Sequence, residues 1–218
     1  MVVDTLIKIA TNADAIARPD NVFGIISRNI MISATVQGML PEAGKRLAVI
    51  KFYEAIKGLQ SAKSNPFFWL QYAIARLVFS DFEKAGVYFE NAYSFAQKRP
   101  RFNTCQIDNH FVRYLLTREI EQGKLETCMN SFRRAHEILM AQMRVEYRHY
   151  PYRHAINYFP FYEKFYKGLA QNDKAFFVGA CESVLGKIAN LPPERRLHHY
   201  VVECKEKLSL IVKTEEGQ

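Results

Sequence analysis

The sequence predicts an all-α fold, and two observations carry this prediction. Helical periodicity covers most of the 218 residues, whereas the strict alternation typical of strands is nearly absent. In addition, two small residues around one phenylalanine recur three times with steps of four and three residues: Ala48, Phe52, Ala55; Ala85, Phe89, Ala92; and Cys128, Phe132, Ala135. These steps place each trio on one helix face. The trios therefore predict helices that pack closely in pairs.

The helix boundaries follow from prolines, glycines and capping residues. The expected helices cover residues 3–17, 22–38, 41–61, 66–79, 82–98, 104–122, 125–144, 176–188 and 197–211. Pro19 ends the first because proline disfavours a helical residue before it, whereas Pro41 and Pro66 suit first turns. Asn103 or Thr104 can cap the helix that Gly123 ends.

The later prolines are expected to interrupt the chain. Pro151 and Pro160 should break the stretch between the last helix pair and the helix before it, and Pro193 suits the first turn of the final helix. Residues 80–81 form a short turn between two helices, which predicts a helix hairpin over residues 66–98.

This hairpin resembles a tetratricopeptide repeat (TPR), a helix-turn-helix unit of about 34 residues. The matching residues are Trp69, Tyr72, Ala73, Phe82, Ala85, Phe89 and Ala92. A looser copy follows at Val112, Leu115, Leu116, Gly123, Leu125, Cys128, Phe132 and Ala135, and Ala48, Phe52 and Ala55 resemble the second helix of a degenerate earlier copy. Arg76 stands where the family usually has an aromatic residue. The resemblance implies antiparallel hairpins stacked as a short α-solenoid over residues 22–142, with additional C-terminal helices.

We expect a single helical domain over residues 1–218, in which residues 143–213 hold an aromatic and basic stretch and the C-terminal helices. The segment Cys105-Gln106-Ile107-Asp108-Asn109-His110-Phe111 is also similar to helical C-terminal regions of bacterial antiphage NTPase-like proteins. That likeness implies a sensor or adaptor in antiviral defence.

Composition narrows the functional classes. The net charge of +8 favours an acidic partner, and four scattered cysteines without a C-x-x-C pair indicate reduced thiols in the cytoplasm. Phosphate-binding glycine loops, nucleophile elbows and metal-ligand spacings are absent from the sequence. The apolar run from residue 66 contains Gln71 and Arg76, so we expect no membrane span. We therefore expect no catalytic residue, no metal, no cofactor and no enzyme activity.

The first candidate site is the concave groove of the predicted repeats. Its expected lining residues are Phe67, Leu70, Ile74, His110, Arg113 and Thr117. An apolar helix face of this kind binds a partner protein or helix, or a second copy of the chain. Because a helix that is apolar nearly all round is usually buried, coverage by the chain itself is the alternative.

The second candidate site is a stretch in which aromatic and cationic side chains alternate. Its expected residues are Arg144, Tyr147, Arg148, Tyr150, Tyr152 and Arg153. Tyrosine and arginine dominate protein interfaces, whereas rings and cations together also hold single-stranded nucleic acid. The leading interpretation is a non-catalytic protein-binding or scaffold module; the alternative is a nucleic-acid-binding helical protein that uses residues 144–166.

Overall fold

The structure, a computed structural model, describes residues 2–16, 42–99, 102–144 and 149–216. The regular secondary structure of these residues is helical. These residues contain no strand, which confirms the all-α prediction. The expected helix at residues 22–38 lies outside the described residues. The chain divides into two compact units, Met1–Ile107 (unit 1) and Asp108–Gln218 (unit 2), and each is described by itself.

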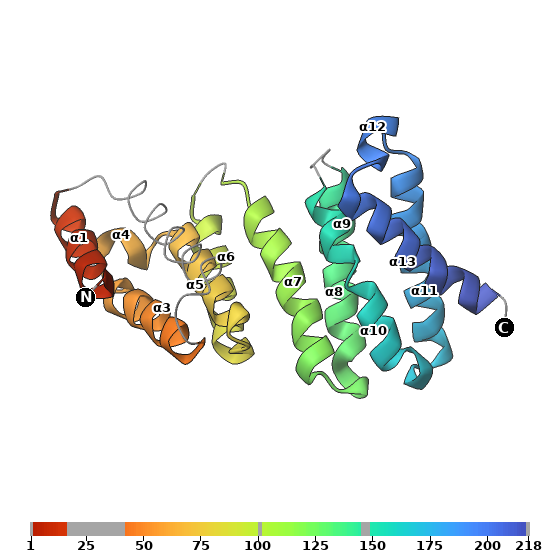
Figure 1. Ribbon diagram of the computed structural model, residues 1–218, viewed down its shortest axis with the longest axis horizontal. Helices are drawn as coiled ribbons and strands as arrows, with labels where there is room; N and C mark the ends of the chain where they lie inside the picture. The colour runs from red at the N-terminus through yellow and green to blue at the C-terminus, as the bar shows by residue number, and fades with distance from the viewer. Residues whose placement is uncertain (1, 17–41, 100–101, 145–148, 217–218) are drawn as a thin grey trace. The chain divides into compact units, whose positions relative to one another are not determined.

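Unit 1 is built from helices that end near the predicted boundaries, except that the helix predicted over residues 41–61 ends at Ile56 and a separate short helix follows it. They are α1 (Val2–Ile16), α3 (Glu42–Ile56), α4 (Gln60–Lys63), α5 (Pro66–Val78) and α6 (Phe82–Gln97). Figure 1 shows α5 and α6 as a helix pair and α1 beside α3. The Asn65 side chain caps α5 by accepting a hydrogen bond from the Phe67 N–H at 3.0 Å. Ser80 ends α5 with a positive φ of 54°, as is common after a helix C-terminus.

The predicted small-residue trio is fully buried on α6 but not on α3. Ala85, Phe89 and Ala92 have no exposed surface. On α3, Phe52 is buried whereas Ala55 is exposed, so the expectation for this trio is wrong at Ala55. The reason is the stripe of large apolar residues on α3, which is Val49, Phe52, Tyr53 and Ile56. Their spacing of three, four and seven residues sets the buried face, and Ala55 lies off that face.

Aromatic rings join the helices of unit 1. Tyr72 on α5 stacks between Tyr53 on α3, at 4.7 Å between ring centroids, and Tyr88 on α6, at 4.2 Å. The Trp69 indole N–H donates to the Lys63 carbonyl at 2.9 Å. These offset rings fix the packing of three helices and satisfy the polar atom of the tryptophan.

In its described residues, unit 2 combines four long helices with short ones. In chain order they are α7 (Cys105–Gln122, whose first residues belong to unit 1), α8 (Leu125–Arg144), α9 (Tyr150–Ala155), α10 (Tyr158–Phe165), the 3₁₀ helix η1 (Tyr166–Gly168), α11 (Gln171–Ala189), α12 (Pro193–Arg196) and α13 (His199–Glu216). Pro151 and Pro160 lie in the first turns of α9 and α10 rather than in a break, because first-turn N–H groups need no helical partner. Pro193 begins the separate α12, so the final helix starts later than expected, at His199.

The core of unit 2 is centred on Phe132 of α8. Its ring lies 4.7 Å from Tyr158, 4.8 Å from Phe161 and 4.7 Å from Phe177, between ring centroids. The trio Cys128, Phe132 and Ala135 has no exposed surface, as predicted. Several aromatic residues that the sequence places near the basic stretch are therefore core residues that hold α8, α10 and α11 together.

Candidate functional site

The residues of the predicted groove fall in both units. In unit 1, Leu70 and Ile74 are buried, whereas Phe67 is 40% exposed and its ring centroid lies 5.1 Å from that of Phe102. In unit 2, His110, Arg113 and Thr117 are half-buried on α7. A groove that joins the two sets stays a prediction.

The residues of the predicted aromatic and basic stretch have different environments. Tyr147 and Arg148 lie outside the described residues, and Arg144 is the last residue of α8. On α9, Tyr150 is 47% exposed and Arg153 is exposed, whereas Tyr152 is only 4% exposed. The Tyr152 ring belongs to the core, so it offers no exposed face to a ligand.

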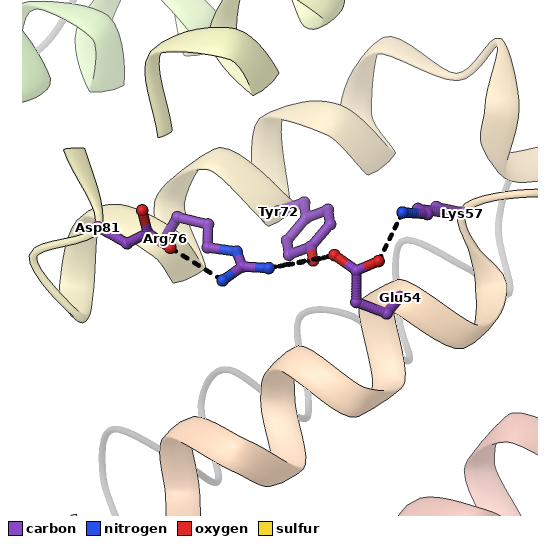
Figure 2. A network of polar contacts seen from close by, with 5 residues as sticks. All are labelled: Glu54, Lys57, Tyr72, Arg76 and Asp81. Atoms are coloured by element: carbon purple, nitrogen blue, oxygen red, sulfur yellow. Dashed lines mark hydrogen bonds and ion pairs between the residues drawn. The ribbon is translucent and has the colours of Figure 1, made fainter. Parts of the chain in front are cut away.

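A buried polar network surrounds Arg76 in unit 1 (Figure 2). The Arg76 guanidinium donates to Asp81 at 2.9 Å and to Glu54 at 3.1 Å, and it also donates to the Tyr72 hydroxyl at 2.7 Å. Glu54 further accepts hydrogen bonds from Tyr72 and from Lys57. The hydrogen bonds from Lys57 and Tyr72 lower the pKa of Glu54 to about 2. This arginine thus has two carboxylate partners.

The network accounts for the arginine at position 76, where the tetratricopeptide repeat that the hairpin resembles usually has an aromatic residue. Arg76 connects α5 with α3 and with Asp81, the residue before α6. A buried cation is tolerated only when carboxylates and hydrogen bonds compensate its lost hydration. Because both terminal guanidinium nitrogens are engaged by these neighbours, we interpret the network as a structural tie.

A second cluster lies on the surface of unit 2, where α13 packs against α9. We call it the aromatic-basic face; its residues are His149, Tyr150, Arg153, His198, His199 and Tyr200. The His149 and His198 rings stack at 3.5 Å between centroids with an interplanar angle of 6°. The Arg153 guanidinium carbon lies 5.1 Å from the centre of the Tyr200 ring. Leu197, which directly precedes His198, is 80% exposed.

Arg153 also belongs to a group of four basic side chains, which we call the basic quartet: His110 and Arg113 on α7, and Arg153 and His154 on α9. Burial and then the charges of Arg113 and Arg153 lower the pKa of His110 to about 4. Burial, His110 and the two arginines lower the pKa of His154 to about 3. Burial and then Arg153 also lower the pKa of Arg113. These mutual effects show that the four groups lie within electrostatic reach of one another.

In the described part of the chain, the arginines of the quartet lack carboxylate partners of the kind that compensate the charge of Arg76. Among the residues that the structure describes, neither Arg113 nor Arg153 forms an ion pair with a carboxylate. The His110 Nδ1 atom is buried and has no hydrogen-bond partner. A buried polar atom without a partner costs about 1–3 kcal/mol. The quartet is therefore a concentration of unpaired positive charge and unused hydrogen-bonding capacity.

The remaining chemistry of the described residues is structural in character. All four cysteines are buried, and burial raises the pKa of the Cys128 thiol to about 11 and that of Cys204 to about 12. Buried thiols of this kind are poor nucleophiles. No group of three or more His, Cys, Asp or Glu side chains in the described ranges could hold a metal ion. None of the described helices has the length and apolar character needed to cross a bilayer.

A hollow of about 470 Å³ also lies on unit 2. Its lining includes Tyr166, Lys174, Glu182 and Glu215. Lys174 lies 5.4 Å from the centre of the Tyr166 ring, and Glu215 accepts a hydrogen bond from Tyr162. The lining contains both positive and negative side chains, so its charge selects neither a cationic nor an anionic ligand.

Comparison of the chain with known protein families, curated proteins and solved structures gives no match. The candidate site is therefore argued from this chain's own geometry.

Sequence reasoning identified part of this site and missed the rest. It selected His110, Arg113, Tyr150 and Arg153, but it placed the first two in a groove with apolar residues. It did not select His149, His154 or the segment from His198 to Tyr200, because their histidines lack metal-ligand spacing. One signal was available: all six histidines of the chain follow residue 107. The approach of α13 to α9 has no local sequence signal.

Proposed function

We propose that this chain is a non-catalytic protein-binding module whose ligand surface is the aromatic-basic face of unit 2. The observation that supports the proposal is the juxtaposition of exposed Tyr150, Arg153 and Leu197 with three histidine rings. Tyrosine and arginine are enriched in protein interfaces, where they supply large contact areas and directed hydrogen bonds. The positive charge of this face and of the whole chain favours an acidic partner segment.

A protein partner suits this face better than single-stranded nucleic acid does. Nucleic acid needs a row of exposed rings for successive bases. In the stretch that the sequence offered for stacking, Tyr152, Tyr158, Phe161 and Phe165 are buried. The basic groups His110 and His154 are recessed rather than spread along a track. This arrangement favours one compact anionic group over an extended phosphate backbone.

We also propose that the α5–α6 pair is a TPR-like hairpin and that such hairpins form a short α-solenoid. The buried Ala85, Phe89 and Ala92 support this proposal, because small residues on α6 allow close approach to α5. In this proposal the helical units are a scaffold for the ligand face. The role as a cytoplasmic sensor or adaptor rests on the sequence resemblance.

The test is a selection from a random peptide library displayed on phage, with the immobilised wild-type chain as target. We expect enrichment of peptides that contain Asp and Glu. Their affinity should fall at least tenfold when Tyr150→Ala and Leu197→Asp are combined, because this pair removes a ring and adds a repelling charge. Leu210→Asp is the matched control, since Leu210 is also exposed, on α13, and we expect it to bind like the wild type.

Two results would contradict the proposal. One is an affinity that is lost equally in Leu210→Asp, which would indicate a general charge effect. The other is a single-stranded oligonucleotide that binds more tightly than any selected peptide and is lost in the Tyr150→Ala, Leu197→Asp variant. That result would assign the face to nucleic acid.

A further inference from the structure

We propose that the basic quartet His110, Arg113, Arg153 and His154 is a binding site for one tetrahedral oxyanion of the phosphate-monoester type. The inference deepens the proposed function, on which it rests for the assignment of the anion to a phosphorylated segment of a protein partner. The binding of the anion itself is measured separately from any partner.

The arrangement of charge points to an anion. Two basic groups on α7 and two on α9 lie within electrostatic reach of one another, and within the described residues no carboxylate contributes to the electrostatics of His110, Arg113 or His154. Carboxylates on the surrounding helices are engaged elsewhere: Asp108 accepts from Gln142 at 2.9 Å, and Glu203 pairs with Lys207 at 3.1 Å. Of the four basic groups, the two arginines are charged at pH 7, and bringing two cations together without a counter-charge costs free energy. A bound dianion offsets that cost.

The donors also fit an oxyanion. A guanidinium presents several N–H groups in a planar fork that matches phosphate oxygens. Arg113 is half-buried on α7, and Arg153 is exposed on α9, with its guanidinium over Tyr200. The unpartnered Nδ1 of His110 supplies a third donor when protonated or in the Nδ1–H tautomer. The site is thus recessed at the histidines and open at Arg153, so a phosphate on a flexible segment can enter.

Anion binding should be coupled to proton uptake. In the free protein both histidines are neutral at pH 7, since their pKa values are about 4 and about 3. A dianion nearby favours the charged imidazolium and raises a histidine pKa by about 1–3 units. The anion therefore binds more tightly as the pH falls toward the raised pKa. Sulfate is the suitable probe because its charge is constant between pH 5 and pH 8.

The experiment uses the full chain, with histidine ring resonances followed by NMR as sodium sulfate replaces sodium chloride at constant ionic strength. We expect saturable shifts of the His110 and His154 rings and a rise of about one unit or more in the pKa of His110. Affinity should increase as the pH is lowered from 6.5 to 5. Unchanged histidine titrations at saturating sulfate would overturn the proposal.

Arginine variants locate the site. Arg113→Met and Arg153→Met should each weaken sulfate binding about tenfold or more, because each removes a charge-assisted hydrogen bond. Arg113→Lys should restore part of the affinity. Arg134→Met is the matched control: Arg134 is exposed on α8 in the same unit and pairs with Glu137, so its loss changes net charge equally and should leave affinity unchanged. Equal weakening in Arg134→Met would overturn the site assignment.

A further variant, Glu146→Gln, tests whether the carboxylate of Glu146, which lies outside the described residues, neutralises the quartet. Glu146→Gln should bind sulfate at least as tightly as the wild type. If only this variant binds sulfate and the wild type does not, the quartet is neutralised by the chain's own carboxylate and the proposal fails.

The source of the phosphate is tested with two probes. O-phosphoserine carries a monoester dianion, whereas an oligothymidylate without a terminal phosphate carries only diesters. We expect arginine-dependent competition with sulfate by O-phosphoserine and none by the oligonucleotide at equal phosphate concentration. The reverse order would keep the anion site but assign it to nucleic acid, and it would contradict the protein-binding proposal. Loss of peptide binding with intact sulfate binding would contradict the proposed function alone.

Discussion

Arg76 in unit 1 is buried and Arg113 in unit 2 is half-buried, and their surroundings differ. Arg76 donates hydrogen bonds to Glu54, Asp81 and Tyr72. Burial lowers its pKa, but Tyr72 and Asp81 outweigh that effect and raise it. Arg113 meets Arg153, and burial together with that like charge lowers its pKa. A buried cation is tolerated when carboxylates compensate its lost hydration, whereas an uncompensated one is costly in the absence of a ligand. The comparison separates a structural arginine from a candidate binding arginine.

The largest expected difference between the units appears in their pH dependence. His110 and His154 have folded-state pKa values below the usual 6.5, so the unfolded chain binds protons first. Their contribution to stability is complete above pH 6.5 and is lost as the pH falls toward 4 and 3. Each histidine lowers the free energy of unfolding by about 1.4 kcal/mol per pH unit below 6.5.

Unit 1 should respond in a lower window, because it contains no histidine. The pKa of Glu54 is lowered to about 2 from 4.5, so its contribution is present above pH 4.5 and is lost as the pH falls toward 2. Hydrogen exchange of α8 and α11 should therefore accelerate between pH 6.5 and 5 after correction for intrinsic rates. Fluorescence of Trp69, the single tryptophan, should report an unchanged unit 1. Parallel loss in both units would contradict the comparison.

Arg76→Met should be the most destabilising of the arginine substitutions. It leaves Asp81 and Glu54 without their shared cation, and breaking a buried ion pair costs about 3 kcal/mol. Urea unfolding followed by Trp69 fluorescence measures this loss in unit 1. Arg99→Met is the control, because the Arg99 side chain donates a long 3.3 Å hydrogen bond to the Ser64 carbonyl near the surface. A change within about 0.5 kcal/mol is expected there. Equal stability of Arg76→Met and Arg99→Met would refute the structural tie.

Ala85→Leu sharpens the comparison between the α6 and α3 trios. Ala85 is fully buried where α6 packs on α5, so the larger side chain should cost roughly 1–3 kcal/mol. Ala55→Leu places the same side chain at an exposed position of α3, and its effect should stay within about 0.5 kcal/mol. Thermal unfolding of both variants is the measurement. A melting temperature of Ala85→Leu at or above that of the wild type would count against close helix packing at this face.

These outcomes mark what the sequence could and could not predict. Periodicity located the helices and the buried faces of α6 and α8, because spacing alone determines which residues share a face. It failed at Ala55, where larger neighbours define the buried stripe, and at Pro151 and Pro160, which lie in first turns. The spacing of residues along the chain did not predict the tertiary contacts. The stacking of His149 on His198 joins residues 49 positions apart.

The candidate site shows the same limit in chemical terms. The sequence does not show whether carboxylates surround an arginine in the folded chain. It therefore could not distinguish Arg76, which pairs with carboxylates, from Arg113, which has no such partner among the described residues. The basic composition indicated an anionic partner. Only the electrostatic effects between residues of α7 and α9 in the folded chain show where the uncompensated charge lies.

The central claim is that the basic quartet is an anion site rather than a structural feature, and the relative stability of Arg113→Met tests it most directly. Hydrogen exchange of α8 and α11 gives the opening free energy of unit 2. In chloride, we predict that Arg113→Met is at least as stable as the wild type, because the substitution removes like-charge repulsion. In sulfate at ten times its dissociation constant, the wild type should gain about 1.4 kcal/mol and become the more stable protein. A variant that is less stable in chloride and gains as much from sulfate as the wild type does would contradict the claim.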